Sequence, residues 1–252
     1  MFRNILLTLL LFPAMALATV SYGVFNFSEV KYDVDQNTNE VRSIASITKL
    51  FTAQTIIDSH ADLRELVKVQ GKSNGRFARG MLVERYELLR AMLMSSDNLA
   101  AESLANAHPG GYEQFLKDAN DRISDMGLKN TVIVDSTGLL AGNQSTVDDL
   151  RDFLFVLRRY ILIQQLSSEK LHTYEYNKNK KHVRVDFRNT NPHLWTYDNI
   201  ILTKTGYTNP AGRCLAMLVE KDGVLYALIT LGNKNMEQRA RVVADMFNRH
   251  IK

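Results

Sequence analysis

Three short clusters in the chain contain residue types that together could cleave an amide bond. Ser46 and Lys49 stand three residues apart in the stretch ASITKL, and Ser-Asp-Asn at residues 96–98 and Lys-Thr-Gly at residues 204–206 follow in that order. Amide cleavage needs a nucleophile, a base that takes its proton, and hydrogen-bond donors for the oxyanion. Since a serine hydroxyl is too weakly acidic to attack unaided, we predict Ser46 as the nucleophile and Lys49 as its base.

The amine of Lys49 can act as a base only in its uncharged form. A free lysine has a pKa of about 10.4, and burial can lower it by up to about 3–5 units. We therefore expect Lys49 to be enclosed beside Ser46.

The spacing Ser-x-x-Lys is not specific by itself, because the chain contains it three times: Ser28 with Lys31, Ser46 with Lys49, and Ser167 with Lys170. Only the middle copy lies at the head of a segment with helical apolar spacing. On a helix, residues i and i+3 share a face, so the lysine would point back over the serine. The structural alternative for this copy is a capping serine with a solvent-exposed lysine.

The helix that must carry this pair is indicated by apolar residues at three- and four-residue steps: Ile47, Leu50, Ala53 and Ile57, with Gln54 as a polar exception. Further helices are predicted over residues 83–94, 99–107, 112–126 (stopping at Gly127), 145–157 and 235–251. Strands are predicted over residues 21–27, 30–34, 182–187, 199–206 and 213–232, the last divided by a hairpin turn at Asp222-Gly223. Strands at both ends with helices between predict an α/β fold of the α+β type, an antiparallel sheet with an inserted helical lobe.

Composition restricts the other possibilities. The chain has 252 residues, 45% hydrophobic and 23% charged, and no linker or repeat divides residues 19–252, so we expect one folded domain there. The net charge is +4, but basic and acidic residues are interspersed, so no nucleic-acid partner is expected. No metal-ligand spacing and no phosphate loop occur, and we predict no metal and no cofactor. Cys214 is the only cysteine and is expected to be a buried, inert thiol.

Residues 1–18 read as a secretory signal peptide. They combine a positive start at Arg3, a short apolar run and the small-residue ending Ala16-Leu17-Ala18. The apolar run is shorter than the ~20 residues that a membrane span needs, and no later stretch could span a bilayer. We expect a periplasmic protein with no stable membrane anchor after signal cleavage.

The longer runs around the three clusters resemble the low-molecular-mass penicillin-binding proteins, and among them the D-alanyl-D-alanine endopeptidases. These runs are RSIASITKL, LMSSDNLAAESLA, HPGGYEQF, DSTGL with NQSTVDDL, FRNTN, and LTKTGYTNPAGRCLAM. The resemblance covers nearly all of the chain after residue 18. It implies the serine β-lactamase/DD-peptidase fold, action on peptidoglycan peptides, and covalent inhibition by β-lactam antibiotics.

The resemblance also implies roles for single residues. Ser96 would relay protons between Lys49 and the leaving amine, and the amide of Asn98 would hold a substrate carbonyl. The oxyanion donors would be the backbone N–H groups of Ser46 and Tyr207. The substrate-binding residues would be Asn98, Lys204, Thr205, Gly206 and Tyr207, with Lys204 and Thr205 receiving a substrate carboxylate. A diaminopimelate cross-link and a terminal D-alanine both have such a carboxylate, so an endopeptidase and a carboxypeptidase stay open.

Two other functions remain as alternatives. A class A-like β-lactamase would need a glutamate in an E-x-x-L-N loop, but the corresponding stretch reads VIVDSTGLLAGN, in which Asp135 is the nearest carboxylate. We therefore expect β-lactams to acylate Ser46 and to leave slowly. A non-catalytic peptidoglycan-binding module is the other alternative, although a binder needs no nucleophile with its base. For Asp97, a solvated loop position and a substrate-facing position stay open.

Overall fold

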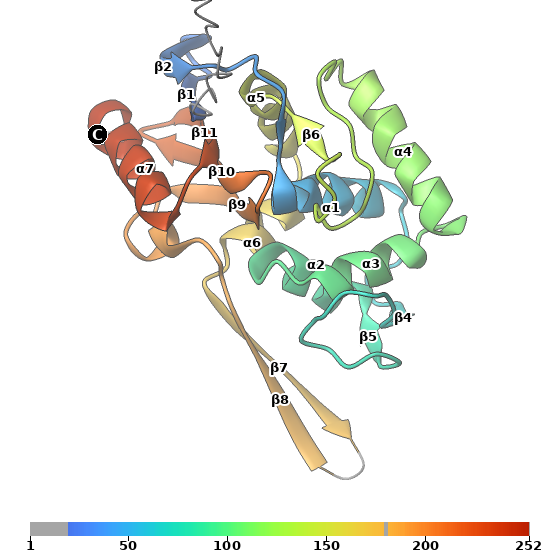
Figure 1. Ribbon diagram of the computed structural model, residues 1–252. Coiled ribbons are helices and arrows are strands. Elements are labelled where there is room, and N and C mark those ends of the chain that lie inside the picture. Colours follow the sequence, from blue (N-terminus) through green and yellow to red (C-terminus); the bar gives the residue numbers. More distant parts are fainter. Residues whose placement is uncertain (1–19, 179–180, 252) are drawn as a thin grey trace, which may run out of the picture.

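The computed structural model describes residues 20–178 and 181–251, so the predicted signal peptide lies outside the described residues. Five antiparallel strands form the main sheet, in which strands from both ends of the chain pair (Figure 1). In sheet order they are β2 (Lys31–Gln36), β1 (Ser21–Asn26), β11 (Val224–Asn233), β10 (Gly212–Lys221) and β9 (Ile200–Thr208). The predicted turn at Asp222-Gly223 joins β10 to β11, and both turn residues have positive φ, 51° and 78°, as a tight hairpin requires. The predicted strands of this sheet are therefore confirmed.

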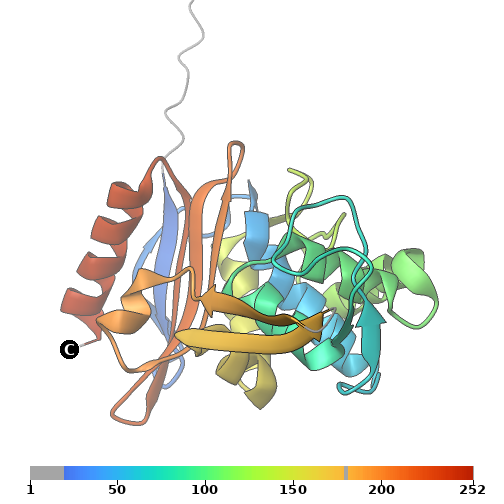
Figure 2. The same ribbon diagram turned by 90° about the horizontal axis from the view of Figure 1, so that it is seen from below.

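Helices cover both faces of the sheet. Along β10, Leu215, Met217 and Val219 face α7 (Met236–His250), whereas the alternate residues Cys214, Ala216 and Leu218 belong to the larger core on the opposite face. Figure 2 shows the sheet between α7 and the remaining helices. Cys214 is fully buried, as predicted, and burial raises the pKa of its thiol to about 11, which disfavours the reactive thiolate.

The larger core is organised around α1 (Thr48–Asp58), which follows the short helix η1 (Ala45–Ile47). The sequence predicted one buried face for this helix, but nine of its residues are buried, from Thr48 to Ile56. Helices pack around it on all sides: α2 (Arg85–Met94), α3 (Asn98–Asn106), α4 (Gly111–Asp125), α5 (Val147–Leu157) and α6 (Ile161–Ser168). A central helix can therefore hold Lys49 away from solvent.

Three pairs of short or separate strands complete the described part of the chain. They are β3 (Arg42–Ser43) with β6 (Gln144–Ser145), β4 (Leu66–Lys68) with β5 (Leu82–Glu84), and β7 (Leu171–Lys178) with β8 (Lys181–Arg188). The predicted strand at residues 182–187 is confirmed as part of β8. Among the described residues it pairs with β7 and not with the main sheet, in a hairpin that projects from the body (Figure 1).

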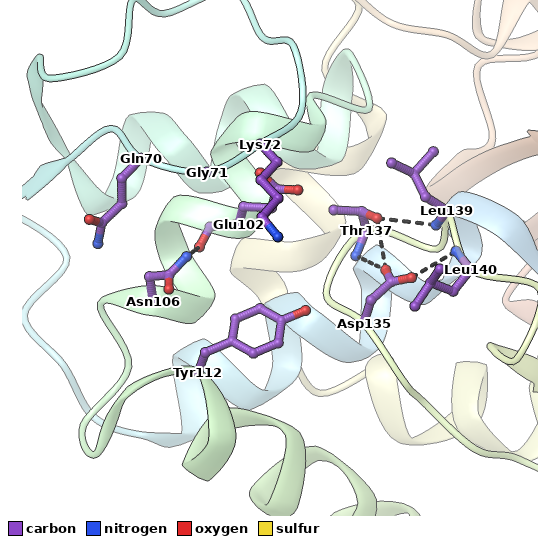
Figure 3. A pocket seen from close by; sticks show the side chains of 10 residues that line it. All are labelled: Gln70, Gly71, Lys72, Glu102, Asn106, Tyr112, Asp135, Thr137, Leu139 and Leu140. Atoms are coloured by element: carbon purple, nitrogen blue, oxygen red, sulfur yellow. Dashed lines mark hydrogen bonds between the residues drawn. The ribbon is translucent and has the colours of Figure 1, made fainter.

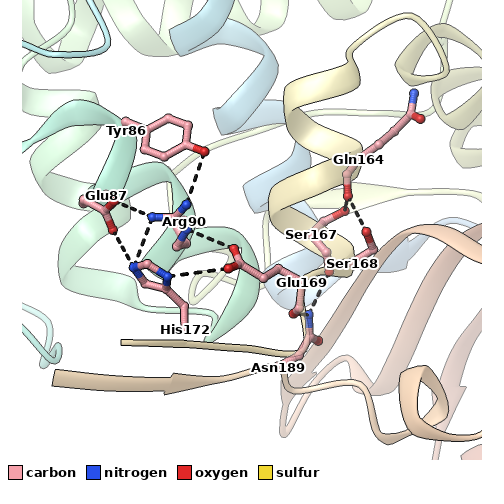
Figure 4. Close-up of polar contacts among 9 residues, drawn as sticks. All are labelled: Tyr86, Glu87, Arg90, Gln164, Ser167, Ser168, Glu169, His172 and Asn189. Carbon is pink, nitrogen blue, oxygen red and sulfur yellow. Dashed lines mark hydrogen bonds and ion pairs between the residues drawn. The ribbon is translucent and has the colours of Figure 1, made fainter. Parts of the chain in front are cut away.

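The base of this hairpin is fastened to α2 by a charged cluster (Figure 4). The guanidinium of Arg90 contacts Glu87 and donates from Nε to Glu169 at 2.9 Å, and His172 Nε2 lies 3.2 Å from Glu87 Oε2. Asn189 donates to the carbonyl oxygens of Ser167 and Glu169, at 2.8 and 2.9 Å. These contacts position the segment after β8, which leads into the site. No helix among the described residues is long and apolar enough to cross a membrane.

Candidate active site

Ser46 lies in the short helix that leads into α1. Two glycines, Gly138 and Gly206, approach the backbone around Ser46 so closely that neither has room for a side chain. A Cβ at Gly138 would come within 2.0 Å of the Ala45 carbonyl oxygen, and a Cβ at Gly206 would lie 3.1 Å from the Ser46 nitrogen. Ala45 itself has a positive φ of 46°, a conformation that costs a non-glycine residue energy. The strand β9 and the turn at residues 135–140 therefore close on the nucleophile from two sides.

Lys49 is fully buried, and its amine lies 3.0 Å from Ser46 Oγ. The same nitrogen lies 2.7 Å from Asn98 Oδ1 and 2.5 Å from the carbonyl oxygen of Thr137. These last two atoms can only accept hydrogen bonds. In a neutral amine, the two N–H groups are therefore committed to Asn98 and Thr137, and the lone pair is left for the hydroxyl proton of Ser46. The structure orients the base as well as placing it.

The burial of Lys49 also sets its charge. Burial lowers the pKa of Lys49 to about 7, although the carboxylates of Asp135, Asp97 and Glu102 act in the opposite direction. At neutral pH a large fraction of the molecules then has an uncharged amine beside the nucleophile. The predicted enclosure of Lys49 is present in the structure.

We predict a pH dependence of acylation that follows from this pKa. The base is active when deprotonated, so the rate of covalent labelling by a penicillin should rise with pH, level off above about 7, and fall about tenfold for each pH unit below it. This rate is measured by labelling the protein with a fluorescent penicillin between pH 5 and 9 and stopping the reaction after fixed times. A profile that is flat over that range would contradict a neutral Lys49 as the base.

Ser96 lies in the loop that joins α2 to α3, and Asn98 is the first residue of α3. Together with Ser46, Thr205 and Tyr207, they line a cavity of about 300 Å³. Ser96 has a φ of 59°, an uncommon conformation for serine that marks a constrained position. Because Asn98 Oδ1 bonds to Lys49, the nitrogen of its amide is free to meet a substrate carbonyl.

Asp97 does not fit either sequence-based alternative. Its side chain is buried, accepts the Ala100 backbone N–H at 2.8 Å, and so caps α3. Its other oxygen accepts the Arg76 backbone N–H at 2.6 Å. The residue is thus neither solvated nor turned toward substrate: it fastens the loop before β5 to the start of α3.

The Lys-Thr-Gly cluster lies on β9, at the edge of the sheet next to Ser46. Lys204 is buried and donates to the carbonyl oxygen of Thr205 at 3.0 Å. Its pKa lies well below the ordinary value, first because of burial and then because of the charges of Lys49 and Arg239. Thr205 shares a hydrogen bond of 2.6 Å with Thr190, between the two hydroxyl groups. All eight predicted site residues are therefore brought to one place.

The side chain of Tyr207 is held by two neighbouring side chains. Its hydroxyl donates to Asn209 Oδ1 at 2.9 Å, and the guanidinium of Arg213 stacks 3.7 Å from its ring centroid. Its hydroxyl proton is therefore already donated, and the predicted oxyanion donor is the backbone N–H group of this residue.

Arg239 was missed in the sequence. It projects from α7, is 3% exposed and lines the same cavity as Ser46 and Arg213. Its Nη1 reaches the Cys214 carbonyl oxygen at 3.5 Å, while Nε is buried with no partner among the described residues. A buried cation on the wall of a cavity, with one of its donors unpaired among the described residues, favours an anionic ligand. The signal that could have revealed it is an arginine on the apolar stripe of the helix, four residues before Val243.

Asp135 has no hydrogen-bonding capacity to spare for catalysis. Its carboxylate accepts the backbone N–H groups of Thr137, Gly138 and Leu140, at 2.6, 2.6 and 2.8 Å, and an N–H of the Asn143 amide at 2.9 Å. Burial alone would raise its pKa, but these hydrogen bonds outweigh burial and lower it. Asp135 organises its turn and is not a base for hydrolytic water, in line with the expected slow release of β-lactams.

An antiparallel sheet with a helical lobe, and a serine-lysine pair between them, define a serine acyl-transfer enzyme of the DD-peptidase class. The family model Peptidase S11, described as D-alanyl-D-alanine carboxypeptidase, matches residues 28–235. The chain belongs to this family, and it is a serine-type D-Ala-D-Ala peptidase.

Two curated relatives are similar over most of the chain. The D-alanyl-D-alanine endopeptidase of Escherichia coli (strain K12) is 40% identical over 216 residues, which cover 79% of this chain and 69% of that protein. The D-alanyl-D-alanine endopeptidase of Pseudomonas aeruginosa is 40% identical over 204 residues, which cover 76% of this chain and 63% of that protein. The chain thus spans about two thirds of the length of each relative.

Two solved structures have the same fold. The Streptomyces K15 DD-transpeptidase superposes with a TM-score of 0.83 at 22% identity, covering 90% of this chain and 94% of that chain. Penicillin-binding protein D2 from Listeria monocytogenes, in a cefotaxime-bound form, gives a TM-score of 0.76 at 23% identity, covering 92% and 96%. The predicted fold class is confirmed.

Proposed function

We propose that the protein is a periplasmic endopeptidase that hydrolyses D-alanyl-diaminopimelate cross-links in peptidoglycan through an acyl-enzyme on Ser46. The observation that carries the chemistry is the buried Lys49 amine, with its pKa near 7, at 3.0 Å from Ser46 Oγ. The two relatives at 40% identity, both named as D-alanyl-D-alanine endopeptidases, support the choice of substrate.

The proposed reaction has two halves. Lys49 takes the hydroxyl proton as Ser46 Oγ bonds to the D-alanyl carbonyl carbon, and the backbone N–H groups of Ser46 and Tyr207 stabilise the oxyanion. Ser96 then donates its hydroxyl proton to the leaving amine as the C–N bond breaks, and it takes the proton held by Lys49, which returns the lysine amine to its neutral form. In the second half, water attacks the ester and gives a proton to Lys49, which passes this proton to Ser46 Oγ as the ester C–O bond breaks. Each oxyanion donor typically contributes roughly 3–4 kcal/mol to lowering the barrier.

The leaving strand places the carboxylate next to its scissile bond against Thr205 and Arg239, which line the cavity. Lys204 is buried next to Thr205 and donates to the Thr205 carbonyl oxygen. Desolvated cations bind a carboxylate through charge-assisted hydrogen bonds, which are about twice as strong as neutral ones. A cross-link ending on the D-centre of diaminopimelate has this carboxylate, and so does a terminal D-alanine. A D-alanyl-D-alanine carboxypeptidase is therefore the second candidate, and the description of the matching family model favours it.

Purified protein without residues 1–18, incubated with dimeric and monomeric muropeptides, tests the proposal. We expect mass spectrometry to show dimers converted to monomers, because the leaving amine of a cross-link bears the required carboxylate. Prior treatment with benzylpenicillin is the control and should stop the conversion. Loss of a single alanine from monomeric pentapeptides, with dimers left intact, would instead identify the carboxypeptidase.

The periplasmic location is supported by the signal-peptide pattern of residues 1–18, and covalent inhibition by β-lactams is supported by the serine-lysine pair. Osmotic shock of cells producing the full chain should release the protein without detergent. Its retention in the cytoplasmic fraction would contradict this part of the proposal.

A further inference from the structure

A second cavity adjoins the catalytic one and has about twice its volume, about 620 Å³ against about 300 Å³. It lies between the loop at residues 70–72, helices α3 and α4, and the turn at residues 135–140 (Figure 3). Leu139 lines both cavities and is half exposed. A ligand joined to Ser46 can therefore extend past Leu139 from one cavity into the other.

The two cavities have opposite electrostatic character. The catalytic cavity is lined by Arg213 and Arg239 and by no carboxylate, whereas the second is lined by the carboxylates of Glu102 and Asp135 and by one cation, Lys72. The leaving strand places its carboxylate in the cationic cavity. The acyl-donor strand, on the other side of the scissile bond, is then directed toward Leu139 and the second cavity.

Two charged groups in the second cavity are available to a ligand. Glu102 is held in place by Ser73, whose backbone N–H and hydroxyl donate to its two oxygens at 3.0 and 2.7 Å, which leaves further lone pairs on both. Lys72 has no ion-pair partner among the described residues, and Figure 3 shows its ammonium turned into the cavity. Tyr112 accepts the Ser136 N–H at 3.2 Å, so its own hydroxyl proton is free to be donated beside Lys72.

We propose that this cavity is a specificity subsite for the acyl-donor strand and binds a zwitterionic amino-acid headgroup. Glu102 receives the ammonium of the headgroup, and Lys72, with Tyr112, receives its carboxylate. The proposal rests on the proposed action on diaminopimelate stems, because the residue before D-alanine in such a stem ends in this headgroup for an endopeptidase and a carboxypeptidase alike. Asp135, whose oxygens are occupied by its own turn, adds negative charge without contacting the ligand.

Three matched β-lactams test the subsite. The first has a side chain that ends in a free amino-acid headgroup, the second has the same headgroup N-acetylated, and the third has its carboxylate converted to an amide. All three acylate Ser46 by the same ring opening, so the ratio of their second-order acylation rates reports on the headgroup alone. For the unmodified protein we expect the first compound to react about tenfold faster than either of the others.

Each variant should remove one of the two preferences and leave the other. Glu102→Gln, which keeps an oxygen for Ser73, should abolish the penalty of N-acetylation and retain that of amidation. Lys72→Met should do the reverse. The controls Glu113→Gln and Lys129→Met change exposed residues outside the cavity and should retain both preferences.

Equal rates for the three compounds in the unmodified protein, or preferences that neither variant alters, would overturn the subsite. That result would leave the proposed endopeptidase function unaffected, because cleavage of muropeptide dimers tests that function separately. Conversely, a protein that reacts with all three compounds in the expected ratios but releases only terminal alanine would refute the endopeptidase and keep the subsite.

Discussion

Ser46→Ala is expected to abolish covalent labelling by penicillin and to lower the cleavage of peptidoglycan substrates by at least about 10⁴-fold. The acyl-enzyme needs an oxygen at this position, and the Lys49 amine lies 3.0 Å from that oxygen. The substitution removes one partly buried hydroxyl, so the fold should be retained, which thermal unfolding by circular dichroism can check. Labelling with fluorescent penicillin, read on a denaturing gel, measures the loss.

Ser28→Ala is the matched control for this variant. Ser28 belongs to another copy of the Ser-x-x-Lys spacing, is exposed, and lies in the turn before β2, so labelling should be unaffected. A labelled band that survives Ser46→Ala would place the nucleophile elsewhere. Absence of labelling in the unmodified protein would favour the peptidoglycan-binding module that the sequence left open.

Lys49→Arg is expected to slow acylation by about 10²–10⁴-fold, because it replaces a neutral base with a permanent cation. A guanidinium has a pKa above 12 and offers no lone pair at any working pH, so it cannot take the proton of Ser46. The N–H groups of the guanidinium can still donate to Asn98 and Thr137, which accept hydrogen bonds from the lysine amine in the unmodified protein. Second-order rate constants for labelling by benzylpenicillin, compared between the two proteins at pH 8, measure the effect.

The pH dependence of the acylation rate in Lys49→Arg distinguishes a base at position 49 from a residue that only supports the structure. If Lys49 is the titrating base, the inflection near pH 7 should disappear in Lys49→Arg, since the remaining rate no longer depends on that amine. Lys31→Arg, from another Ser-x-x-Lys copy, should keep both the rate and the inflection. An inflection that persists in Lys49→Arg would assign the titration to a different group.

The catalytic pair was predictable because its determinants are local. Helical spacing alone places a lysine three residues after a serine on the same face, and the apolar run beyond it predicts burial. The order of the three clusters then supplied the remaining site residues through resemblance to a known family. The main strands and the turn at Asp222-Gly223 followed from alternation and turn chemistry.

The residues that sequence reasoning misjudged depend on contacts made across the fold. Asp97 reads as a polar loop residue, and only its two backbone donors, Ala100 and Arg76, show that it is a buried cap. Arg239 is distant in sequence from every cluster, and α7 brings it to the cavity only by packing on the sheet. The strand β8 has ordinary strand periodicity, which does not specify whether it pairs with the main sheet or with β7.

The close approach of Gly138 to Ala45 bears on how this scaffold could evolve under antibiotic selection. Any side chain at Gly138 would collide with a backbone carbonyl at 2.0 Å, and the neighbouring Thr137 carbonyl is already bonded to Lys49. A substitution at Gly138 therefore cannot install a carboxylate that activates water for release of the drug. Drug hydrolysis that used this position would require reconstruction of the turn.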